Sequence, residues 1–169
     1  MGPVDLYLVR HAIAEPRDHE RWPDDSKRPL SPEGAELFRL AARGLQRMGV
    51  EVEAVLSSSY VRAWRTAEIL TEEAGWPSPA AAPELEATSS AAAALELAGS
   101  RAESLLALVG HEPDLSELTS LALTGDPHAV ATQLKKGGVV CLRFGGAPAA
   151  GRAELRWSAS PKILRQLGR

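Results

Sequence analysis

The chain alternates short apolar segments with segments of helical period, and this alternation restricts its fold more than any other feature. Residues 4–9 (VDLYLV), 52–56 (VEAVL) and 105–109 (LLALV) are typical of buried strands. Helices are predicted over 31–48, from 61 to near Gly75, and over 90–98, 113–123 and 161–167, and two late strands over 139–144 and 154–157. Apolar strands that alternate with helices favour an α/β fold with a mainly parallel sheet. Because the two late strands are close in sequence, part of the sheet is expected to be antiparallel.

The size and charge of the chain exclude several classes of function. Its 169 residues fit a single domain, 1–169. The net charge of -3 provides no overall positive field for nucleic acid or an anionic membrane, so any attraction for an anion must be local. No apolar run approaches the roughly 20 residues of a transmembrane helix. The single cysteine, Cys141, can build neither a disulfide framework nor a zinc cluster, which predicts a reducing, cytoplasmic location.

A long polar segment follows the first strand. Residues 14–29 (AEPRDHERWPDDSKRP) carry three prolines and charges of both signs, which predicts a surface loop. Loops of this length commonly act as lids or binding loops, or are disordered.

Cationic and imidazole side chains follow three of the predicted strands. Arg10 and His11 come directly after the first, Arg62 lies at the start of the helix after the second, and His111 follows the third. Ligands of open α/β sheets bind beyond the carboxyl ends of parallel strands, so these four side chains are expected to share one site. Each has a structural alternative when taken alone, as a solvated arginine or a core histidine. Arg62, however, lies in a first helical turn, where the helix dipole favours acids, and a bound anion would explain its position.

These residue types suit the transfer of a phosphoryl group. Arginine is always charged and its planar fork binds oxyanions, while a neutral imidazole nitrogen can attack phosphorus. A guanidinium beside His11 disfavours the imidazolium form and keeps the nucleophile free near neutral pH. A metal site built from His11 and His111 would need nearby carboxylates, and two arginines would oppose a cation. We therefore expect neither a metal nor a cofactor.

Three segments, in this order, resemble motifs of the histidine phosphatase superfamily, also called the phosphoglycerate mutase-like superfamily. Residues 10–12 (RHA) resemble its RHG signature, residues 57–67 (SSSYVRAWRTA) its SSPxxRAxQTA segment, and residues 109–113 (VGHEP) its second histidine motif. The short chain, residues 28–31 (RPLS) and the segment from Trp157 to the SPK of 160–162 look most like SixA-type phosphohistidine phosphatases.

The resemblance implies a fold and a set of roles. The implied fold is a phosphoglycerate mutase-like three-layer α/β sandwich, in which helices flank a mainly parallel sheet with some antiparallel edge. His11 would be the nucleophile that is phosphorylated in the intermediate, Arg10 and Arg62 would bind the phosphoryl oxygens, and His111 would hydrogen-bond the transferring group. The resemblance also implies that Arg28 adds a phosphate contact from the loop.

The chain departs from the family pattern at three positions. Ala12 replaces the usual glycine, which is tolerable unless the backbone there needs a positive φ. Tyr60 and its neighbours lack the usual proline, and this absence is expected to affect only the turn. Arg65 replaces a frequent glutamine and could add charge to the rim of the pocket.

The general acid is the least defined part of the predicted site. Many phosphomonoesterases of this family use a Glu or Asp to protonate the leaving alcohol, and Glu84 and Glu86 (PELEA) are the candidates here. The alternative is that both are solvated loop carboxylates. Phosphohistidine has an imidazole leaving group and a labile P–N bond, so a missing acid would fit the SixA-like interpretation.

The predicted function is that of a metal-independent phosphatase that forms a phosphohistidine intermediate and dephosphorylates protein phosphohistidine. Its predicted partner is therefore a histidine-phosphorylated protein domain. The alternative is a small-molecule phosphomonoesterase of the same superfamily, acting on a sugar phosphate or a nucleotide, and a working general acid would favour it. A phosphate-binding module without catalysis ranks below both, because all four core residues are present. Neither nucleic acid nor a membrane is an expected partner.

Overall fold

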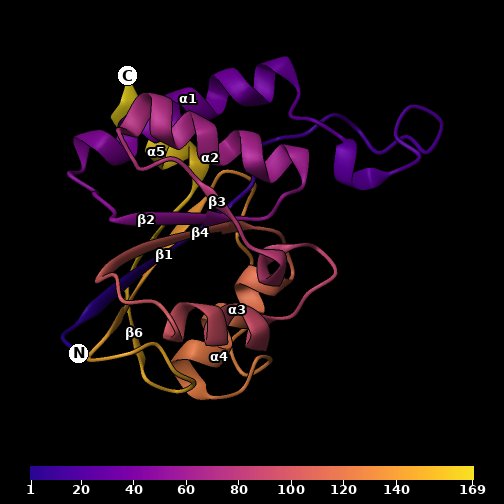
Figure 1. Ribbon diagram of the computed structural model, residues 1–169. Coiled ribbons are helices and arrows are strands. Elements are labelled where there is room, and N and C mark those ends of the chain that lie inside the picture. Colours follow the sequence, from indigo (N-terminus) through magenta and orange to yellow (C-terminus); the bar gives the residue numbers. More distant parts are fainter.

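A six-stranded mixed sheet forms the centre of the molecule, and the computed structural model describes residues 1–169 of it (Figure 1). The strands lie in the order β3-β2-β4-β1-β5-β6. Their bounds are Val4–Arg10 (β1), Ala54–Ser57 (β2), Ala80–Ala81 (β3), Leu105–Gly110 (β4), Val139–Phe144 (β5) and Ala153–Ala159 (β6). Strands β1 to β4 pair in parallel, whereas β5 is antiparallel to both β1 and β6. The predicted α/β sandwich with a mainly parallel sheet and an antiparallel edge is confirmed.

Five helices cover the two faces of the sheet. They are α1 (Pro32–Arg47), α2 (Val61–Ala74), α3 (Ala91–Gly99), α4 (Asp114–Thr124) and α5 (Pro161–Gly168). Helices α1, α2 and α5 lie on one face, and α3 and α4 lie on the other (Figure 1). Serine side chains at positions 31, 90 and 160 accept a hydrogen bond from the first turn of α1, α3 and α5. None of the helices has the length and apolar character that a membrane crossing requires.

The sheet separates two apolar cores. In β1, Tyr7 and Val9 pack into the core below α1 and α2, while Leu6 and Leu8 pack into the core above α3 and α4. Side chains of β4 alternate between the same two cores. A strand that is buried on both faces must be apolar at every position, which explains why these strands have no polar alternation in the sequence.

The carboxyl ends of β1, β2 and β4 meet at one edge of the sheet. Arg10 pairs with Gly110, and Ser57 pairs with Val109, so the residues that follow these strands emerge side by side. The loop of residues 14–30 extends from this edge (Figure 1). It contains one 3-10 turn, Asp25–Lys27, and its two ends are joined by an isolated bridge between Ala14 and Leu30. The segment predicted as a loop is therefore a loop with closed ends.

Candidate active site

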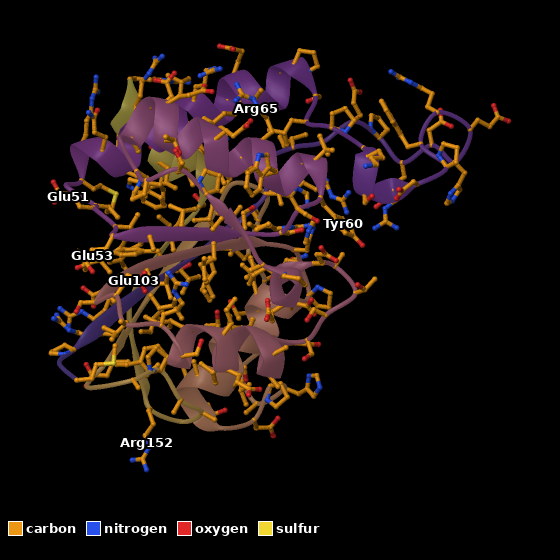
Figure 2. All side chains as sticks on the ribbon, viewed as in Figure 1. Glu51, Glu53, Tyr60, Arg65, Glu103 and Arg152 are labelled. Atoms are coloured by element: carbon orange, nitrogen blue, oxygen red, sulfur yellow. The ribbon has the colours of Figure 1, made fainter.

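A cavity of about 480 Å³ opens at the carboxyl edge of the sheet. It contains all five of the cationic and imidazole side chains that the sequence predicted for the site. The complete lining consists of Arg10, His11, Ala14, Glu15, Pro16, Arg17, Arg28, Arg62, Ala87, His111, Glu112 and Lys136. Figure 2 labels Tyr60 at this end of the sheet, whereas the labelled acids Glu51, Glu53 and Glu103 lie at the opposite end. The acidic end and the cationic cavity are therefore separated by the length of the strands.

His11 is held in one tautomer by its own backbone. Its Nδ1 lies 2.7 Å from the carbonyl oxygen of Ala12, and because a carbonyl only accepts, Nδ1 must carry the proton. The lone pair of the ring is therefore on Nε2. Burial lowers the pKa of His11 from 6.5 to about 3, and the cations of Arg62 and Arg10 lower it further against the hydrogen bond to Ala12. His11 is thus neutral at physiological pH, as the sequence argument expected, although burial is a larger cause than the neighbouring arginine.

Arg10 and Arg62 are each fixed through their Nη atoms. Arg10 donates from Nη1 to the carbonyl oxygen of Leu134 at 2.9 Å. Arg62 donates from Nη1 to the carbonyl oxygen of Asp25 at 2.8 Å, and its Nη2 lies 3.1 Å from the Asp25 carboxylate. The Nε–H groups of both arginines are buried and have no protein partner. Buried donors of this kind require an acceptor, and the oxygens of a phosphoryl group would supply one.

His111 lies beside His11, with 5.2 Å between the ring centroids. Its Nε2 is 2.8 Å from the hydroxyl of Ser58, and the Tyr60 ring packs edge-on against it with 5.0 Å between centroids. The Nδ1 atom is buried without a partner. Burial, followed by the charges of Arg62 and Arg10, lowers the pKa of His111 to about 3. If Ser58 donates to Nε2, the proton of the neutral ring is on Nδ1, which can then donate to a transferring group.

Replacing Ser58 with alanine is expected to lower kcat/KM by roughly 10- to 100-fold, because Nε2 of His111 loses its only partner in a buried site. Ser58→Thr retains a hydroxyl and is expected to restore most of the activity. Ser57→Ala is the matched control, since Ser57 is equally buried but its hydroxyl donates to the carbonyl oxygen of Ser58. Turnover of p-nitrophenyl phosphate by the three variants tests this, and full activity of Ser58→Ala would contradict it.

The predicted loop residue Arg28 also lies in the cavity, but two of its donors are used within the loop. The side chain is only 8% exposed and donates from Nε to Asp25 at 2.8 Å and from Nη1 to the carbonyl oxygen of Glu15 at 2.7 Å. Asp25 therefore bridges Arg28 and Arg62. The hydrogen bond from Arg28 is the largest cause of the lowered pKa of Asp25, which keeps its carboxylate charged. Sequence reasoning missed Asp25, and its only signal was an acid three residues before Arg28.

The predicted acids Glu84 and Glu86 do not line the cavity. The carboxylate of Glu86 accepts a hydrogen bond of 2.8 Å from Ser59, and the small side chain of Ala87 lines the cavity instead. The carboxylates that do line it are Glu15 and Glu112, which sequence reasoning missed. That of Glu112 accepts from the backbone N–H and the hydroxyl of Ser116 at the start of α4, so it acts as a helix cap.

The three departures from the family pattern have local explanations. Ala12 has a negative φ, like every other non-glycine residue, so the backbone does not require glycine there. Its N–H donates to the hydroxyl of Thr66 at 3.0 Å. Tyr60 stands at the N-cap of α2 and makes no side-chain cap. The expectation that Arg65 adds charge to the pocket rim is wrong, because Arg65 pairs with Glu68 and Glu72 along α2 and is absent from the cavity lining.

No group of three or more His, Cys, Asp and Glu side chains is arranged to hold a metal ion. The arrangement that does exist is an imidazole with a free Nε2, a second imidazole, four guanidinium groups and one ammonium group around one cavity. It can bind a tetrahedral anion and present Nε2 of His11 to it.

Comparison with known proteins assigns the chain to a family. The family model of the histidine phosphatase superfamily (branch 1) matches residues 6–88, and the chain belongs to this superfamily of phosphatases. An uncharacterised protein of Picosynechococcus sp. is 35% identical over 167 residues, which cover 95% of this chain and 99% of the relative.

Two solved structures share the fold. The protein histidine phosphatase SixA in complex with tungstate has a TM-score of 0.79 at 23% identity, over 95% of this chain and 99% of that one. A mycobacterial glucosyl-3-phosphoglycerate phosphatase has a TM-score of 0.66 at 18% identity, over 94% of this chain and 100% of that one. The fold is thus shared by phosphatases with protein and with small-molecule substrates.

Proposed function

We propose that this chain is a metal-independent phosphatase that removes the phosphoryl group from phosphohistidine in a partner protein, through a phosphorylated His11. The observation that carries the proposal is the composition of the cavity. It brings His11, His111, Arg10 and Arg62 together, and Ala87 lines the wall near the predicted acids. We further propose that residues 1–169 act as one domain, and that the protein works in a reducing cytoplasm, where buried Cys141 remains a free thiol.

The chain's own residues account for each step of such a reaction. Nε2 of His11 attacks phosphorus, a new N–P bond forms, and the P–N bond of the substrate breaks. Arg10 and Arg62 hold the phosphoryl oxygens through their free Nε–H groups, and His111 donates to the same group. Water then attacks the phosphorus of phosphorylated His11, the N–P bond breaks, and phosphate leaves with His11 neutral again.

The leaving group decides between protein phosphohistidine and a phosphate ester. An imidazole that carries a proton on its second ring nitrogen departs as a neutral molecule, so the protein needs no acid beside it. An alkoxide leaving group needs a proton from a carboxylic acid, and this general acid catalysis raises the reaction rate by about 10²–10⁴-fold. Of the two carboxylates in the cavity, that of Glu112 is occupied by the N-terminus of α4. The site is therefore better suited to an imidazole leaving group.

A small-molecule phosphomonoesterase remains the second candidate, and one observation favours it. Glu15 lines the cavity, and its backbone carbonyl, rather than its carboxylate, accepts the hydrogen bond from Arg28. Glu15 could therefore take the part that the sequence assigned to Glu84 or Glu86.

The two candidates are separated by comparing kcat/KM on a histidine-phosphorylated protein with kcat/KM on a panel of alkyl phosphates. We expect the phosphohistidine substrate to be preferred by at least about 10²-fold, the factor attributed to a missing general acid. Hydrolysis of the phosphohistidine substrate is expected to be unchanged in three variants, Glu15→Gln, Glu84→Gln and Glu86→Gln. A faster reaction on an alkyl phosphate, together with a loss of about 10²-fold in Glu15→Gln, would instead identify a phosphomonoesterase.

A further inference from the structure

Two cations line the cavity without belonging to the predicted phosphoryl-binding group. Arg17 and Lys136 share the lining with His11 and Arg62. No carboxylate lies within ion-pair distance of either cation, whereas Arg39, Arg43, Arg65 and Arg101 are all paired. Unpaired cations at the mouth of an anion-binding cavity are available to a ligand.

The position of Lys136 is set by the strand that carries the nucleophile. The N–H of the next residue, Gly137, lies 3.1 Å from the carbonyl oxygens of both Arg10 and His11. Partial burial and the charges of Arg10 and Arg28 lower the pKa of Lys136. Lys136 is exposed as a residue, and it lines the cavity together with these two arginines.

The acids around the cavity compensate Arg28 and Arg62, whereas Arg17 and Lys136 have no carboxylate partner, nor has Arg10, which the proposed mechanism assigns to the phosphoryl group. Asp25 pairs with Arg28 and Arg62, and Glu112 is turned toward the N-terminus of α4. Glu15 is the remaining carboxylate, and it would repel an anion placed beside it. A second anionic group is therefore best accommodated between Arg17 and Lys136.

The size of the cavity allows such a group. One water molecule occupies about 30 Å³ in the liquid. A phosphoryl group, with about four heavy atoms, needs only a few times this volume. A cavity of about 480 Å³ therefore holds a phosphoryl group together with part of the molecule that carries it.

We propose that Arg17 and Lys136 form a second anion subsite, which binds an anionic group carried by the substrate next to its phosphoryl group. The inference rests on the proposed function and deepens it, since a phosphohistidine with a neighbouring Asp or Glu would be the preferred protein substrate. A small ester with a second phosphate or a carboxylate offers the same chemistry, so the experiments must distinguish these two sources.

The subsite is tested first by calorimetric titration with phosphate and with pyrophosphate, which needs no turnover. Pyrophosphate is expected to bind the wild-type protein about tenfold more tightly or better. Lys136→Gln and Arg17→Gln should each weaken pyrophosphate binding by about three- to tenfold and change phosphate binding by less than about twofold. Lys135→Gln is the matched control, because Lys135 is the neighbouring lysine and does not line the cavity. An unchanged preference in both variants, or an equal loss in Lys135→Gln, would overturn the subsite.

The source of the anionic group is tested by turnover. A histidine-phosphorylated protein with an acid beside the phosphohistidine is compared with its amide variant, and phosphoglycolate is compared with ethyl phosphate. We expect the acid to raise kcat/KM for the protein, and Lys136→Gln to remove this gain. A gain confined to phosphoglycolate would overturn the protein substrate while the titration still supports the subsite. Failure of the subsite and failure of the proposed function are thus separate results.

Discussion

His11→Ala is expected to lower kcat by roughly 10³-fold or more, because the variant lacks the nitrogen that attacks phosphorus. The expectation follows from three properties of His11. It lies at the end of β1 inside the cavity, its Nδ1–H is fixed by the Ala12 carbonyl, and its depressed pKa keeps Nε2 unprotonated. The same properties predict that phosphate accumulates on His11 during turnover. Mass spectrometry after quenching without acid should find it there, because the N–P bond is labile in acid.

The exposed loop histidine provides the control for this experiment. His19→Ala changes the same residue type in the segment 14–30 and is expected to retain full activity. Calorimetric binding of inorganic phosphate by His11→Ala would show that the variant still forms the arginine pocket. Phosphate found on His111, or activity of His11→Ala within tenfold of wild type, would contradict the proposed mechanism.

The parts of the site that could be predicted are those fixed by strand ends. These side chains end a strand (Arg10), directly follow one (His11 and His111) or lie in the first turn of the next helix (Arg62), and the parallel pairing of β1, β2 and β4 brings them together. Apolar strands and helical spacing are local in the sequence, so this half of the site follows from local patterns. Most bounds of the secondary elements follow within about one residue for the same reason, whereas β2 begins at Ala54 instead of 52 and β6 ends at Ala159 instead of 157.

The rest of the site depends on contacts between segments that are distant in sequence. Asp25 contacts Arg62 only because the 14–30 loop folds back to α2. Ser58 contacts His111 because the paired strands β2 and β4 end side by side. The predicted acids Glu84 and Glu86 are absent from the cavity lining for a related reason. Glu84 and Glu86 are close to Ala87 in sequence, but Glu84 lies within a short 3-10 turn over Pro83–Leu85, Glu86 caps this turn, and the chain presents only Ala87 to the cavity. Which of several adjacent residues faces a cavity is set by loop geometry, for which the sequence carries no periodic signal.

The free energy of unfolding is expected to fall as the pH decreases from 6.5, because His11 and His111 are buried in the neutral form. Both have a folded-state pKa of about 3 against an ordinary value of 6.5. Between these values the unfolded chain binds more protons than the folded one, so the stabilisation is complete above pH 6.5 and is lost as the pH falls toward 3. At pH 5 each histidine accounts for a loss of about 2 kcal/mol.

Urea unfolding at pH 7.5 and pH 5.0 measures this loss of stability. Variants without the two histidines separate their contribution to the loss from that of the carboxylates. The raised pKa of Asp114 acts in the opposite direction, since its carboxyl takes up its proton in the folded state first, so the wild-type curve alone is not decisive. The double variant His11→Gln/His111→Gln keeps Asp114 and every other acid. It is expected to lose about 4 kcal/mol less than the wild type between the two pH values. His19→Gln should behave like the wild type, because His19 is exposed. Equal losses in the wild type and the double variant would mean that the two imidazoles are protonated in the folded state at pH 5, and the neutral nucleophile on which the mechanism depends would then be excluded at that pH.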